Sequence, residues 1–242
     1  MPKIYRMRDK SDKFTVDKGL LPDLSFRMLL IMRTGGGKTN LIANLLLRDE
    51  FNNRDFRGED IHIFSPVTND SKMETVIEEK LVPDENIHHE LDNEALGELY
   101  EQLVEDFRES VQDETRPRNK LIVMDDISYS GALRKGHYNM VNKVFMNGRK
   151  HSISILVCSQ FYNHISPAMR SQASCIIVGN QSDRQLENVV DDNNYLESKR
   201  AFRKMFREEV VEKHDFLVIN YSNSRRDMYL DSDFEVIRTT PT

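Results

Sequence analysis

The stretch LLIMRTGGGKTNLIANLLL, residues 29–47, constrains the fold of this chain more than any other feature. An apolar run leads into three consecutive glycines, and Lys38 and Thr39 then open a segment with leucines at helical spacing. A strand, a glycine turn and a helix in this order gather backbone N–H groups and a helix N-terminus around one anion. The stretch therefore predicts a phosphate-binding loop within an α/β fold.

We expect the whole of this loop and the first turn of the helix to bind a nucleotide, through Thr34, Gly35, Gly36, Gly37, Lys38, Thr39 and Asn40. Lys38 would reach the β- and γ-phosphates, and the Thr39 hydroxyl would bind Mg²⁺. The usual pattern G-x-x-x-x-G-K-[ST] has a glycine where this chain has Met32. A β-carbon is tolerated there if φ stays negative, so Met32 loosens the match without removing a phosphate-binding group. A glycine turn that binds no ligand is the alternative.

Two acidic residues, Asp125 and Asp126, directly follow the apolar run LIVM. Mg²⁺ is usually held by one carboxylate together with phosphate oxygens and waters, and Asp125 is the natural partner, through water. Asp126 would polarise the attacking water, and solvent-facing strand ends are the alternative for the pair. The next apolar run ends in Ser159 and Gln160. Either would lie beside the γ-phosphate if this strand lies between the other two, and Gln160 is the better candidate for orienting the water.

Apolar runs alternate with amphipathic segments along the rest of the chain. Strand-like runs are expected near residues 26–31, 59–67, 119–128, 152–160 and 173–181. The alternation predicts an α/β fold: a P-loop NTPase core with a mostly parallel central sheet, helices on both faces and a C-terminal β-hairpin within residues 215–231. We expect residues 1–24 to be a polar lead-in and residues 25–242 to form the P-loop ATPase domain.

Composition excludes several classes of protein. The net charge of −6 over 242 residues argues against a protein that coats nucleic acid, since such binding needs an excess of Lys and Arg. No apolar run approaches the roughly 20 residues that span a bilayer, and the N-terminus lacks an apolar signal segment. The two cysteines, Cys158 and Cys175, lie in apolar runs and are expected to be small buried residues in a reducing compartment.

Taken together, the motifs resemble those of the genome-packaging ATPases of double-stranded DNA viruses in the FtsK/HerA superfamily. The resemblance covers about residues 26–237 and rests on the Walker A segment 34–39, the Walker B pair Asp125–Asp126, the segment Gly148-Arg149-Lys150-His151, Gln160, Pro167 and Arg170-Ser171. It implies Mg²⁺-dependent ATP hydrolysis that drives double-stranded DNA into a capsid. It also implies a homo-oligomeric ring of five or six subunits and a portal or procapsid partner. The implied location is the cytoplasm of an infected host cell, with association at the virion vertex.

The same resemblance places ATP at a subunit interface, where an arginine of the neighbouring subunit completes the site. Arg149 matches that position best and Arg170 is the second choice, with a surface salt bridge as the alternative role. Departures from the family pattern are Met32 and Asp126, where the family often has glutamate. Arg134 and Lys135, in the segment after the Walker B pair, are candidates for DNA contact, and the basic segment 199–207 is the alternative.

Three other functions are alternatives for this set of motifs. The segment Asn180-Gln181-Ser182-Asp183 is similar to the guanine-reading motif of GTP-binding switch proteins, but it lacks the lysine. A nucleotide-binding scaffold without turnover would retain the loop and explain Met32. A small-molecule kinase would need an acceptor pocket, for which no motif is present.

Overall fold

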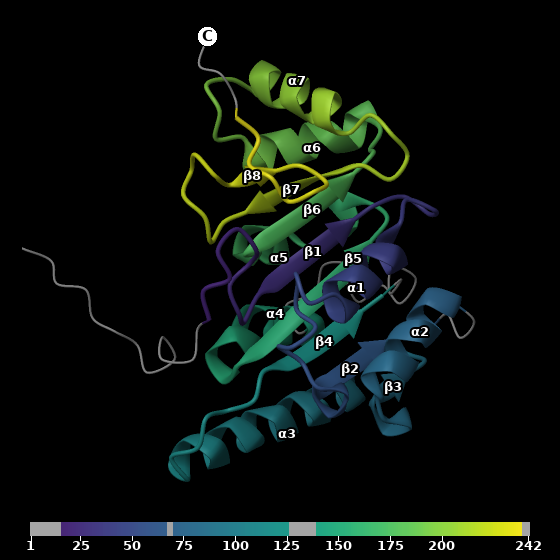
Figure 1. The fold of residues 1–242 in the computed structure, drawn as a ribbon, viewed down its shortest axis with the longest axis vertical. Helices are drawn as coiled ribbons and strands as arrows, with labels where there is room; N and C mark the ends of the chain where they lie inside the picture. The colour runs from purple at the N-terminus through teal and green to yellow at the C-terminus, as the bar shows by residue number, and fades with distance from the viewer. Residues whose placement is uncertain (1–15, 67–69, 126–138, 239–242) are drawn as a thin grey trace, which may run out of the picture.

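The computed structural model describes residues 16–66, 70–125 and 139–238. Its centre is an eight-stranded sheet (Figure 1). The strands are β1 (Arg27–Ile31), β2 (Ile61–Phe64), β3 (Ile87–His88), β4 (Lys120–Met124), β5 (Ile153–Ser159), β6 (Cys175–Gly179), β7 (Phe216–Asn220) and β8 (Tyr229–Leu230). Asp126, Arg134 and Lys135 lie outside the described residues, so their predicted roles stay predictions.

The strand order is β3-β2-β4-β5-β1-β6-β7-β8. Strands β3, β2, β4, β5, β1 and β6 run parallel, and β7 and β8 form the expected antiparallel hairpin at one end. Strand β5 therefore lies between β1 and β4, the position that the prediction for Gln160 required. Because these three strands are parallel, the phosphate loop, Asp125 and Gln160 all follow strands at the same edge of the sheet.

Helices cover both faces of the sheet, as predicted. The α-helices are α1 (Lys38–Leu47), α2 (Ser71–Lys80), α3 (Asn93–Gln112), α4 (Met140–Asn147), α5 (Pro167–Gln172), α6 (Asp183–Asn193) and α7 (Lys199–Glu209). One apolar cluster joins α1 and α2 to one face, and a second joins α3 to α7 to the other. In Figure 1, α6 and α7 lie at the same end of the molecule as the β7–β8 hairpin.

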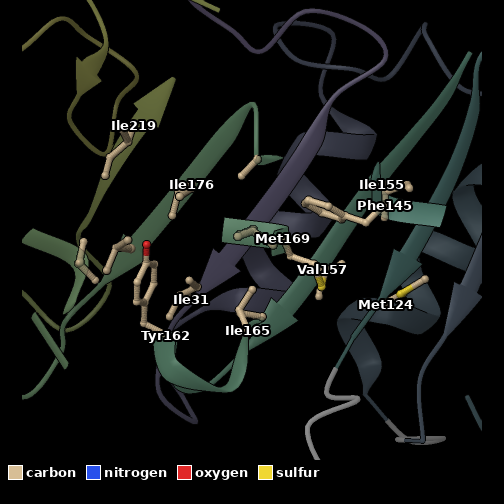
Figure 2. Packing of buried hydrophobic residues seen from close by; sticks show 14 of the residues in the cluster. Ile31, Met124, Phe145, Ile155, Val157, Tyr162, Ile165, Met169, Ile176 and Ile219 are labelled. Carbon is tan, nitrogen blue, oxygen red and sulfur yellow. The ribbon is translucent and has the colours of Figure 1, made fainter. Parts of the chain in front are cut away.

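Successive side chains of a strand point to opposite faces of the sheet, so each strand contributes residues to both apolar clusters. In β1, Leu29 and Ile31 join the cluster of α3 to α7, while Met28 and Leu30 join the cluster of α1 and α2. Figure 2 shows Ile31 among the residues of the cluster of α3 to α7. The central strands are buried on both faces, which explains why their sequences are continuous apolar runs. Cys158 and Cys175 are free and buried, as expected.

The basic segment 199–207 forms helix α7, and three of its five basic side chains pair with acidic residues of helix α6. Three ion pairs join the helices: Arg207 with Asp183 at 3.1 Å, Arg203 with Glu187 at 2.5 Å and Lys199 with Asp191 at 2.6 Å. The acidic partners recur every four residues along α6 and therefore share one face. The segment is thus not an unopposed basic surface, which weakens its claim as the alternative DNA contact. Within the described ranges, no helix has the length and apolar character needed to cross a membrane.

Candidate nucleotide-binding site

The glycine loop connects the carboxyl end of β1 to the first residue of α1. Gly35 and Gly37 have φ of +71° and +98°, in the left-handed region that favours glycine. Gly37 is the N-terminal cap of α1, and the first turn of that helix carries no acidic residue. The first turn of α1 therefore presents the positive end of the helix dipole to a bound anion without a competing carboxylate in that turn.

Met32, which replaces the usual first glycine of the loop, is accommodated by two other glycines. Its side chain is buried, and its N–H donates to the Ser159 carbonyl over 3.1 Å. A β-carbon on Gly36 would lie 3.1 Å from Met32 Cβ, and one on Gly179 would lie 2.9 Å from Met32 Cγ. Gly179 ends β6, so its role was not visible from the spacing of the loop itself. The missing glycine is offset by a glycine on the neighbouring strand.

The side chain of Lys38 folds back onto the loop. Its Nζ donates to the carbonyls of Met32, over 3.0 Å, and Arg33, over 3.4 Å. These bonds hold the ammonium group against the phosphate loop. A fixed cation at this point supplies the charge that a nucleotide phosphate requires.

The phosphate loop, Asp125 after β4 and Gln160 after β5 meet at one cavity of about 310 Å³. Of the predicted site residues, it is lined by Thr34, Gly35, Gly37, Lys38, Thr39, Asn40, Asp125 and Gln160. Four further residues complete it: Asp70, Ser71 and Lys72 at the start of α2, and His214 just before β7. Gly36 lines the neighbouring cavity instead. The structure therefore brings together groups from residues 34–40, 125 and 160 that the sequence separates widely.

Ser159 and Gln160 have different surroundings. Ser159 is buried, and its hydroxyl donates to the Phe161 carbonyl over 2.9 Å and accepts from the Phe161 N–H over 3.3 Å. Gln160 lines the cavity. Asp125 is 7% exposed at the end of β4, and its N–H donates to the Phe64 carbonyl. Of Ser159 and Gln160, only Gln160 lines this cavity.

A second cavity of about 690 Å³ adjoins the first. The two share Gly37, Asn40, Lys72 and His214. Three aromatic rings line the second cavity, with Phe234 packed edge-on against Phe51, at 5.1 Å between centroids, and Phe216, at 6.0 Å. Polar groups add to its wall: Asn44, Arg48, Glu50, Ser232 and Asp233. A cavity lined by the phosphate loop and adjoining one lined by aromatic rings suits a nucleotide, with phosphates in the first and base in the second.

Arg149 lies at the opposite edge of the sheet from the phosphate loop. It belongs to a 3₁₀ turn, η5 (Gly148–His151), which precedes β5. Burial, and then the like charge of Arg149, lower the pKa of Arg27 at the start of β1. A strand rises about 3.3 Å per residue, so the seven residues of β5 put roughly 20 Å between Arg149 and Gln160. Arg149 cannot serve the phosphate cavity of its own chain.

Arg170, the second choice, is held by contacts within its own chain. Its guanidinium lies 2.5 Å from an oxygen of Asp192 and 4.7 Å from the ring centroid of Tyr162. Tyr162 in turn donates to Asp192 over 3.0 Å, and Asn193 donates to the Tyr162 hydroxyl over 3.0 Å. Arg170 thus takes part in a structural network between α5 and α6.

In the segment 180–183, Gln181 and Asp183 make contacts within the fold. Gln181 is buried and donates to the Ile31 carbonyl over 3.4 Å, and Asp183 pairs with Arg207. None of residues 180–183 lines the two adjoining cavities. This arrangement disfavours a guanine-reading role.

Comparison with known families decides the relationship. The family model of the poxvirus A32 protein matches residues 12–239, nearly the whole chain. The chain belongs to the poxvirus A32 family. No curated protein sequence matches this A32-family chain.

Solved structures show the same fold. The A32-family chain is similar to the genome packaging NTPase B204 from Sulfolobus turreted icosahedral virus 2 in complex with AMPPCP: 14% identity, 82% of this chain and 93% of that chain covered, TM-score 0.55. It is also similar to B204, the DNA-packaging ATPase from Sulfolobus turreted icosahedral virus: 12% identity, 86% and 97% covered, TM-score 0.53. The family and the shared fold confirm the resemblance to viral packaging ATPases and the predicted fold class.

Proposed function

We propose that this A32-family chain is an ATPase that moves double-stranded DNA into a viral capsid. The observation that carries the proposal is the convergence of the phosphate loop, Asp125 and Gln160 on one cavity, beside an aromatic-walled cavity of suitable size for a base. The B204 proteins that share this fold are a genome packaging NTPase and a DNA-packaging ATPase. Location in the cytoplasm of an infected cell follows from the same proposal, as does association with the virion vertex.

ATP would bind with its phosphates on the loop and its base between the aromatic rings of the second cavity. The segment from Thr34 to Asn40 supplies N–H groups, the Lys38 ammonium and the Thr39 hydroxyl. Asn40 lines both cavities, so it lies where phosphates give way to ribose and base. An electrostatic cradle without side chains in its way suits a triphosphate.

Mg²⁺ fits the oxygen donors of this cavity. The Thr39 hydroxyl and the Asp125 carboxylate both line it, and Mg²⁺ prefers such ligands together with phosphate oxygens and water. The ion would neutralise the charge that develops on the phosphates. Thr39 and Asp125 would hold it from the two sides, one on α1 and one at the end of β4.

Hydrolysis needs a water aligned with the γ-phosphorus and a group that takes its proton. We assign the first task to Gln160, on the strand between the loop and Walker B strands, and the second to Asp126. Attack breaks the bond to the β–γ bridging oxygen and releases ADP and phosphate. The negative charge on the leaving group is met by Lys38 and, in a ring, by Arg149 of a neighbouring subunit.

A ring explains why Arg149 lies so far from the cavity of its own chain. A head-to-tail ring joins two different surfaces of neighbouring subunits, and in the proposed ring the amino edge of one sheet would meet the carboxyl edge of the next. The arginine would therefore reach a nucleotide that its neighbour binds. A ring of five or six subunits would also repeat each basic loop around a pore, and DNA and a portal or procapsid protein are the proposed partners.

Nucleotide binding and turnover, measured with Mg²⁺ and with EDTA, test the enzymatic part of the proposal. Wild-type protein should hydrolyse ATP only with Mg²⁺, and Lys38→Ala should lose binding or turnover because the phosphates lose a fixed counter-charge. Tight binding without phosphate release would support the scaffold instead, and a preference for GTP would revive the switch protein.

A further inference from the structure

The turn between α7 and β7, residues 210–215, lies beside the phosphate loop although it is more than 170 residues away in sequence. The direction of β7 is the cause. Strand β7 is antiparallel to β6, and Phe216 at its start pairs with Gly179 at the carboxyl end of β6. The residues just before β7 are thereby delivered to the edge of the sheet where the phosphate loop begins.

Two basic side chains of this turn approach two glycines of the phosphate loop. A β-carbon on Gly35 would lie 3.8 Å from Lys213 Nζ, and one on Gly37 would lie 3.3 Å from His214 Nδ1. Both residues are exposed, so a ligand in the cavity can reach them. His214 lines the phosphate cavity and the aromatic cavity alike.

The turn is fixed by hydrogen bonds that leave both basic side chains outside the network. The Asp215 carboxylate accepts from the N–H groups of Val211, over 3.1 Å, and Glu212, over 2.6 Å. The N–H of Asp215 donates to the Glu212 carbonyl, and the N–H of Phe216 donates to the Ser232 hydroxyl. A preorganised turn loses little conformational entropy when its side chains bind a ligand.

We infer that Lys213 and His214 form a second set of nucleotide-binding residues, supplied by the C-terminal part of the chain; the inference rests on the proposed nucleotide site. Lys213 approaches Gly35, toward the tip of the loop, so it binds the β- and γ-phosphates. His214 approaches Gly37 at the junction of the two cavities, so it contacts the α-phosphate and ribose. The turn thereby discriminates triphosphates from monophosphates.

Charge in the cavity supports this assignment. Carboxylates of Asp70 and Asp125 line the phosphate cavity, and the chain as a whole carries a net charge of −6. Lys38 and Lys72 line it as well, and Lys213 lies at its edge. Three lysines therefore surround the phosphate loop although the protein as a whole is acidic, and their positive charge favours binding of a polyphosphate.

Calorimetric titration of the full chain with ATPγS and with AMP, both with Mg²⁺, tests the inference. Lys213→Gln should weaken ATPγS binding about tenfold, because a charge-assisted hydrogen bond is lost, and should change AMP binding less than twofold. His214→Ala should weaken both ligands about fivefold. Lys204→Gln and His89→Ala are matched controls: both residues are exposed, and neither lines the two cavities.

Lys38→Ala separates failure of this inference from failure of the site itself. If wild type binds ATPγS, Lys38→Ala does not, and both turn variants bind like their controls, the inference is wrong and the nucleotide site stands. If wild type binds neither ligand, or if Lys38→Ala binds as wild type does, the proposed site fails and the inference fails with it. Because Lys213 and His214 are exposed, neither substitution removes a side chain from the core.

Discussion

Met32 and Gly179 form a matched pair: the side chain at the entrance of the phosphate loop occupies the space that a β-carbon on β6 would need, 2.9 Å from Met32 Cγ. An off-pattern residue in one motif is thus balanced by a glycine outside it. Met32 is thus packed into the fold at this position. Met32 and Gly179 depend on each other, because a larger residue at position 179 would collide with the Met32 side chain.

Gly179→Ala should therefore destabilise the protein by about 1–3 kcal/mol, the usual range for an overpacked core. Met32→Ala should also cost stability, because it removes most of a buried side chain. The double variant Met32→Ala/Gly179→Ala should recover part of the loss of Gly179→Ala, since the two changes relieve each other. Urea unfolding of the four proteins measures this coupling. Strictly additive losses would show that the two residues do not share space.

Gln160 and Ser159 should respond differently to removal of their polar groups. Gln160→Ala should keep nucleotide affinity and lose about 10²-fold or more in turnover, because the water is no longer oriented. Ser159→Ala removes the hydrogen bonds with Phe161, so its main effect should be on stability, by about 1 kcal/mol. Single-turnover hydrolysis with a parallel binding assay separates the two. Equal turnover of Gln160→Ala and wild type would remove Gln160 from the mechanism.

Asp126→Asn should bind ATP normally and hydrolyse it very slowly, since the amide cannot take a proton from the attacking water. The measurement is phosphate release beside nucleotide affinity. Hydrolysis at the wild-type rate would mean that another group is the base.

Arg149→Ala should be nearly inactive on its own, although the arginine lies roughly 20 Å from Gln160 of its own chain. Mixing Arg149→Ala with Lys38→Ala subunits should restore part of the turnover, because some interfaces then pair an intact loop with an intact arginine. The control is Arg170→Ala mixed in the same way, whose defect should be structural and reflect its contact with Asp192. Absence of rescue in rings shown to exchange subunits would contradict the role in trans.

His62 provides a test of stability against pH. Burial, then the nearby His88 and Lys120, lower its pKa to about 4, so the folded protein holds it neutral. The unfolded chain binds a proton near pH 6.5, so stability contributed by neutral His62 is present above that pH and is lost as the pH falls toward 4. Between pH 7 and pH 5 the loss should be about 2 kcal/mol. His62→Gln should show a smaller loss than wild type, with exposed His89→Gln as the control; equal losses in all three proteins would contradict the assignment.

The parts of the fold that depend on local patterns were predictable. Continuous apolar runs indicated β1, β4, β5 and β6, and helix α1 begins at Lys38 and ends at Leu47 as expected. Helix α6 was not predicted: the base-reading motif considered at residues 180–183 reaches only its first residue, and its acidic face is explained only by the basic residues of α7. The two-residue strand β3 is too short to give an alternating pattern.

The candidate site also has a part that the sequence predicted and a part that it did not. The glycine loop, Asp125 and Gln160 belong to strand-end motifs, so their convergence followed from a parallel sheet. Lys213, His214 and Gly179 were not identified, because their proximity to the loop depends on the antiparallel pairing of β7 with β6. The sequence showed a hairpin but gave no indication of which edge of the sheet its first strand would start from.

The rate of ATP hydrolysis against added duplex DNA, at low and moderate salt and in a preparation of measured mass, tests the central claim most directly. The account predicts an oligomer whose Mg²⁺-dependent turnover is stimulated by double-stranded DNA, with stimulation that weakens as salt displaces contacts to phosphates. Arg134→Ala/Lys135→Ala should reduce the stimulation, and Lys38→Ala should abolish turnover with or without DNA. An oligomeric protein that hydrolyses ATP at a rate no DNA changes would contradict the claim that this chain is itself a DNA motor.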